Sequence, residues 1–158
     1  MPDLKPPRLV ADERVTLLTL IQYQRDSFVR KVAGVDEGRA RQNPVVSGTN
    51  LLWLTKHMAR AESLWVIRRF AGLDFDLPEE SVRPEDTVDS AVATYKEVWR
   101  QVNGVIAAAP SLDEVCRDVG DEAPVNLRWV LMHLLEEIAR HAGHAHILRE
   151  SIDGTTGR

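Results

Sequence analysis

The sequence predicts an all-α four-helix bundle. Four long segments repeat apolar residues at the three- and four-residue spacing of an amphipathic helix, and loops that contain proline or glycine separate them. No useful stretch alternates apolar and polar residues as a half-buried strand does. The length of 158 residues suits one ordinary domain. We therefore expect residues 1–158 to form a single helical bundle.

The first predicted helix covers residues 12–33 and has Asp12 as its N-cap. The second begins at Thr49 or Asn50, since either side chain can accept a hydrogen bond from the first turn. It ends at Gly72, a residue suited to a helix stop.

Thr87 caps the third predicted helix, which ends near Ala109. Asn126 caps the fourth, which continues to about Ile152. At 1.5 Å per residue this last helix is roughly 40 Å long, the longest element. Residues 73–86 hold two prolines and several acidic residues and are expected to form a crossing loop.

Composition excludes several classes of protein. The formal net charge is −4 and the pI is about 5.7, which argues against a nucleic-acid partner because such proteins usually carry a basic face. No apolar run reaches the length of a signal peptide or a membrane span. Cys116 is the only cysteine, so no intrachain disulfide forms, and we interpret it as a packing residue in a reducing compartment. We expect a cytoplasmic protein with no membrane partner.

The last predicted helix is rich in histidine. On a helical wheel, Glu137 and His141 fall inside or at the margin of the arc that must face the core. His133 and His144 lie at the edge of that arc, just beyond Glu137. His146 points almost directly away.

A carboxylate on the core side of a helix is costly unless it is paired or binds a metal. Glu137 and His141 stand at i and i+4, so their side chains can converge on one ion. A third ligand must come from another helix, and His57, on the flank of the second apolar stripe, is the only histidine outside the last helix. Two imidazoles and one carboxylate leave open coordination positions, as catalytic zinc and non-haem iron sites do. Such a site activates a water or a thiol.

Simpler interpretations stay open at this point. His57 alone is typical of a satisfied core histidine, and Glu137 with His141 can be a plain hydrogen-bonded pair. Neither the His-Glu-x-x-His zinc motif nor the paired Glu-x-x-His of di-iron bundles occurs. Trp53 and Trp129 are expected to pack rather than to line a pocket.

Three stretches, residues 44–49, 52–62 and 127–154, resemble the DinB/YfiT-like superfamily of small helical bundles. The resemblance covers nearly the whole chain and looks like an actinobacterial branch of unknown function. It implies an up-down-down-up bundle. It also implies a metal held by one histidine of the second helix and two ligands of the last.

The superfamily pattern maps onto His57, Glu137 and His141. Many relatives carry histidine where this chain has Glu137, which is similar to the mycothiol-dependent maleylpyruvate isomerase branch. Many have glutamine where this chain has His144, so His144 can be a fourth ligand, a hydrogen-bond partner of a ligand or a substrate contact.

The resemblance implies a metal-dependent S-transferase, or a related isomerase or hydrolase, that uses a low-molecular-weight thiol such as mycothiol on a small-molecule substrate. His144 or His133 would orient a ligand or relay a proton. Zinc suits the mixed nitrogen and oxygen ligands, and nickel, manganese and iron do too. The alternatives are a non-catalytic metal-binding or stress-linked interaction protein, as a homodimer, and a purely structural bundle.

Overall fold

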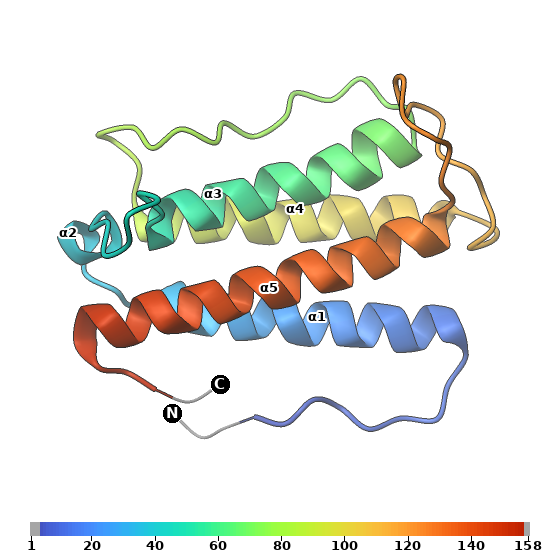
Figure 1. Ribbon diagram of the computed structural model, residues 1–158. Helices are drawn as coiled ribbons and strands as arrows, with labels where there is room; N and C mark the ends of the chain where they lie inside the picture. The colour runs from blue at the N-terminus through green and yellow to red at the C-terminus, as the bar shows by residue number, and fades with distance from the viewer. Residues whose placement is uncertain (1–3, 157–158) are drawn as a thin grey trace.

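Four long helices form the bundle in the computed structural model, which describes residues 4–156 (Figure 1). The elements, in chain order, are α1 (Glu13–Val32), a short α2 (Glu37–Ala40), α3 (Leu51–Glu62), the π-helix η1 (Ser63–Phe70) that continues α3, α4 (Val88–Ala108) and α5 (Leu127–Asp153). In Figure 1, α1 and α5 run in one direction while α3 and α4 run in the other, so the up-down-down-up topology is confirmed.

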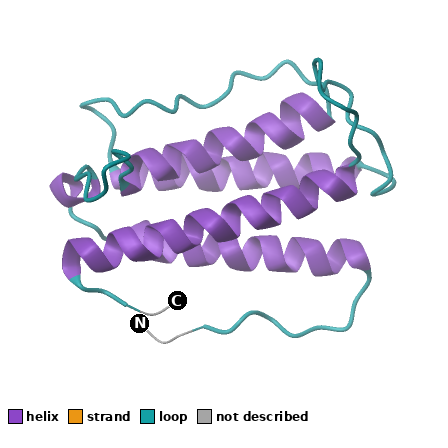
Figure 2. Ribbon diagram, in the orientation of Figure 1, coloured by secondary structure: helices purple, strands orange, loops and turns teal. Residues whose placement is uncertain are grey.

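Figure 2 shows that loops join the helices directly. Within residues 4–156 the only strand-like feature is an isolated antiparallel bridge between Val115 and Asn126. The prediction of an all-α fold is therefore confirmed.

Each long α-helix begins at a polar cap. Asp12, Asn50, Thr87 and Asn126 each accept a hydrogen bond from the backbone N–H three residues later. These bonds satisfy N–H groups that lack a partner inside the helix. Of the two candidates for the second helix, Asn50 is the cap.

The second helix stops before Gly72, as predicted, but the conformation of its last turns was not predicted. Its last turns, η1, have π-helical hydrogen bonding, and the carbonyls of Arg69 and Phe70 accept from the backbone N–H groups of Asp118 and Arg117. Gly72 follows with φ of 61°, and a β-carbon there would lie 2.9 Å from the Arg117 Cβ. Glycine is therefore required both by the left-handed backbone and by the close approach of the neighbouring loop.

The crossing loop, residues 71–87, is a consequence of topology. Because α3 and α4 are parallel, the chain must return along the whole length of α3 before α4 begins, as Figure 1 shows. Arg60 donates to the Pro78 carbonyl at 3.1 Å, and Lys56 forms an ion pair with Asp86. These contacts fix the loop against α3.

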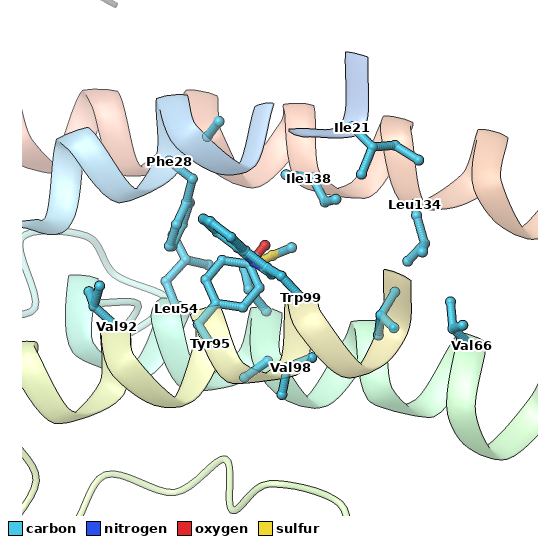
Figure 3. Close-up of a cluster of buried hydrophobic side chains, with 14 of the residues drawn as sticks. Ile21, Phe28, Leu54, Val66, Val92, Tyr95, Val98, Trp99, Leu134 and Ile138 are labelled. Carbon is cyan, nitrogen blue, oxygen red and sulfur yellow. The ribbon is translucent and has the colours of Figure 1, made fainter. Parts of the chain in front are cut away.

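The core lies between the α1/α5 pair and the α3/α4 pair. Figure 3 shows Phe28, Tyr95 and Trp99 meeting there, with ring centroids 5.8 Å apart for Phe28 and Tyr95 and 5.0 Å apart for Tyr95 and Trp99. A fully buried ion pair accompanies them. Arg25 contacts Glu62 in bidentate fashion, and the Tyr95 hydroxyl donates to the same carboxylate at 2.6 Å. These bonds offset the cost of burying two charges.

No helix within residues 4–156 has the length and apolar character needed to cross a bilayer. Cys116 is a free, buried thiol, and burial raises its pKa. This supports its interpretation as a packing residue.

Candidate metal centre

His57, Glu137 and His141 converge where α3 passes α5. One ligand atom from each side chain lies within 4.8 Å of the other two. The His141 Nε2 atom lies 2.9 Å from Glu137 Oε1, and the His57 Nε2 atom lies 3.5 Å from the same oxygen. The two imidazole centroids are 4.9 Å apart at an interplanar angle of 70°. The side chains are only 13–24% exposed, so the cluster is partly shielded yet open to a small ligand.

Each imidazole of the cluster has a polar partner at its Nδ1 atom. His57 Nδ1 lies 2.9 Å from Glu80 Oε1, and His141 Nδ1 lies 3.3 Å from His144 Nδ1. The Trp53 indole stacks on the His57 ring, with ring centroids 5.0 Å apart. A ring held in this manner presents Nε2 in a fixed direction, which is the usual arrangement of a histidine that ligates a metal.

The protonation states favour metal binding. Burial lowers the pKa of His141, and the nearby His57 and His144 lower it further, against the opposing effect of Glu137. His141 is therefore neutral at pH 7. Burial acts to raise the pKa of Glu137, but its hydrogen bonds and charge interactions with His141 and His57 outweigh that effect, so the net pKa is lowered. The carboxylate stays ionised.

The donor set fits a divalent cation. With its Nδ1–H donated to Glu80, His57 would offer the lone pair of Nε2 to a cation, beside the carboxylate oxygens of Glu137. A cation between them would satisfy both. Tetrahedral zinc lies about 2.1 Å from nitrogen and oxygen ligands, which places these ligand atoms about 3.4 Å from one another. Atoms that lie within 4.8 Å of one another would therefore need to approach by at most about 1.4 Å.

Of the remaining predicted residues, His144 lies beside the cluster and His133 lies outside it. The His144 ring is 5.3 Å from that of His141. It also lines a hollow of about 230 Å³ whose other polar side chains are Ser47 and Thr49. The His133 ring instead packs against Trp65 and Trp129. The roles of His144 and His133 in catalysis stay predictions.

His146, as the helical wheel predicted, points elsewhere. It lines a separate hollow of about 710 Å³ between α1 and α5, and its Nε2 atom lies 3.9 Å from Glu150. It therefore contributes nothing to the cluster.

Sequence reasoning missed Glu80. It lies in the crossing loop, where no helical period indicates which side chains face the bundle. The available signal was topological, because a loop that returns along α3 must pass His57. The expected packing role of Trp53 and Trp129 is met only in part: Trp53 stacks on a candidate ligand, and Trp129 is 44% exposed.

Comparisons with known proteins agree with this fold. A family model described as mycothiol-S-transferase matches residues 16–154. No curated protein matches the chain. Among solved structures, a conserved protein from Enterococcus faecalis is similar, with a TM-score of 0.61 and 17% sequence identity over 92% of this chain and 100% of the other. At that identity the likeness shows the fold alone.

Proposed function

Because a family model covers residues 16–154, the chain belongs to the mycothiol-S-transferase family, and we propose that it is a divalent-metal-dependent enzyme that transfers a low-molecular-weight thiol to an electrophilic small molecule. Mycothiol is the proposed thiol, in keeping with the family's description. Zinc is the proposed metal, since two imidazoles and a carboxylate suit it, although nickel, manganese and iron accept the same donors.

One observation carries the proposal. Three potential ligand atoms from two helices converge within 4.8 Å, and both imidazoles are fixed through their far nitrogens by Glu80 and His144. A plain Glu–His hydrogen bond requires neither the third residue nor the outer partners. Three protein ligands also leave room for an exogenous one, as catalytic zinc sites do.

The residues of the cluster have separate roles in the proposed reaction. His57, Glu137 and His141 would hold a divalent cation, which would lower the pKa of a bound thiol and so supply a thiolate at neutral pH. His144 would orient His141 through the 3.3 Å contact between their Nδ1 atoms, and the thiol proton would pass to solvent. The thiolate sulfur then forms a bond to the electrophilic carbon while the bond to the leaving group breaks.

The test measures metal content and thiol transfer in the same preparations. Wild-type protein should bind one zinc ion per chain and accelerate the alkylation of mycothiol by monobromobimane, which releases bromide and gives a fluorescent thioether. His141→Ala should weaken zinc binding by more than about 100-fold, since it removes a ligand rather than an outer partner, and should abolish the acceleration.

His146→Ala is the matched control, because it removes an imidazole from the same helix but outside the cluster. It should leave both measurements unchanged. Stoichiometric zinc without turnover would instead support the non-catalytic metal-binding protein. Wild-type protein that binds none of the four metals would contradict the metal site itself.

A further inference from the structure

Two rows of side chains face each other where α3 and η1 pass α5, each with a residue at every fourth position. The row on α3 and η1 consists of Trp53, His57, Ala61, Trp65 and Arg69, and the row on α5 consists of Trp129, His133, Glu137 and His141. Residues four apart lie on the same side of a helix. The candidate metal centre occupies one end of the paired rows, and an aromatic cluster occupies the other.

The aromatic cluster consists of Trp65, Trp129 and His133. Trp129 stacks on His133 with centroids 5.0 Å apart and an interplanar angle of 19°. Trp65 meets His133 edge-on at 4.6 Å and Trp129 at 5.3 Å. The cluster thus joins η1 to α5, as His57 and Glu137 join α3 to α5.

The aromatic cluster is more exposed to solvent than side chains that only pack a core. Trp129 remains 44% exposed, although an aromatic ring of this size gains most when it is fully buried. Trp65 belongs to a π-helical segment, a rare conformation that recurs at functional sites. The exposed Trp129 ring and the partly buried Trp65 ring form an apolar surface near the candidate metal centre that a ligand can cover.

Ala61 separates the two ends of the paired rows. It is half-buried and has the shortest side chain in either row. It stands one helical turn from His57 and one from Trp65, so these two lie about 12 Å apart along the helix. The aromatic cluster and the metal centre are therefore within reach of one small organic molecule.

We propose that the aromatic cluster binds the flat, apolar part of the electrophilic co-substrate while its reactive carbon lies at the metal centre. This inference rests on the proposed function and specifies its substrate class as electrophiles that carry a planar apolar group several bonds from the reactive carbon. Recognition is by stacking rather than by charge. The Arg69 guanidinium, whose Cζ atom lies 4.3 Å from the centroid of the Trp65 ring, is held by both oxygens of Glu122.

Binding of two product-like thioethers tests the proposal without requiring turnover. S-(4-phenylbutyl)cysteine carries a planar ring at the end of a four-carbon chain, and S-butylcysteine has the same thioether, chain and amino acid without the ring. By calorimetry, the zinc-loaded wild-type protein should bind the aryl compound about tenfold more tightly, the value of one good stacking contact. Trp129→Leu should abolish this preference, and Trp129→Phe should retain most of it because a ring remains.

Met132→Ala is the control, since Met132 is 58% exposed on α5 but lies outside both rows. It should keep the preference. Circular dichroism and zinc content verify that Trp129→Leu is folded and metallated, and the phenylalanine variant covers the case in which it is not. Equal affinities for the two thioethers, no measurable aryl binding, or an unchanged preference in Trp129→Leu would overturn the inference.

The same measurements separate this inference from the proposed function. A protein that binds no zinc but prefers the aryl compound through Trp129 would retain the aromatic cluster as a binding surface and refute the metal enzyme. A protein that transfers mycothiol with no aryl preference would refute the cluster alone.

Discussion

Replacing Glu80 by alanine should weaken zinc binding about tenfold without disturbing the fold. Its carboxylate accepts a hydrogen bond from His57 Nδ1 at 2.9 Å. Loss of a hydrogen-bond partner of a metal ligand typically weakens metal affinity by about 10- to 100-fold. The lower end applies here because the Glu80 side chain is 34% exposed and also interacts with Arg60 at 3.6 Å, so solvent weakens its effect. A tenfold loss corresponds to about 1.4 kcal/mol.

The assay is competition for zinc between the protein and a chromophoric chelator at fixed pH and salt. Glu80→Gln should lose less, on the order of threefold, because the amide oxygen still accepts but carries no charge. Glu79→Ala is the matched control: that neighbouring carboxylate accepts from Ser81 and Arg83 rather than from a candidate ligand.

Zinc affinity within twofold of wild type in Glu80→Ala would refute the reasoning, provided that His141→Ala has lost zinc in the same assay. Equal losses in the Glu79 and Glu80 variants would also refute it, since a general loss of negative charge would then explain both.

Two other carboxylates should control stability. Glu62→Ala should lower the free energy of unfolding in urea by about 3–5 kcal/mol, because Arg25 is left buried without its ion-pair partner. Replacing both residues by methionine should recover most of that free energy. A loss below about 1 kcal/mol in Glu62→Ala would contradict this prediction. The backbone N–H of Arg83 and the ammonium of Lys56 lower the pKa of Asp86 below its ordinary 3.8. The unfolded carboxyl therefore binds protons more readily, so the stability from Asp86 is complete above pH 3.8 and disappears as pH falls through the lower folded value. Asp86→Asn should lack this component in acid unfolding curves, and identical pH profiles would exclude it.

Local interactions made the helices predictable. A cap such as Asn50 and the N–H that it binds are three residues apart, so the signal lies in a short stretch of sequence. The same holds for Glu137 and His141, which are adjacent on one helix. Adding His57 required the further assumption that the second and last helices touch, which periodicity alone does not establish.

Contacts between distant segments were not predictable. Nothing near Arg25 in the sequence indicates that Glu62, 37 residues later, meets it in the core. Glu80 lies in a loop without periodicity. The π-helical turns of η1 were also missed, since the backbone there depends on how the loop after α4 binds the last carbonyls of the helix.

The parallel course of α3 and α4 has a consequence for how such sites can diverge. An antiparallel hairpin would have joined the two helices by a short turn at one end, far from His57. The long return brings an irregular strip of chain past the midpoint of α3, where Glu80 reaches an imidazole. Residues in this strip can change in identity and even in number while the interhelical core stays as it is. The connection between two scaffold helices is thus where ligand orientation and co-substrate choice can be altered at the least expense to folding.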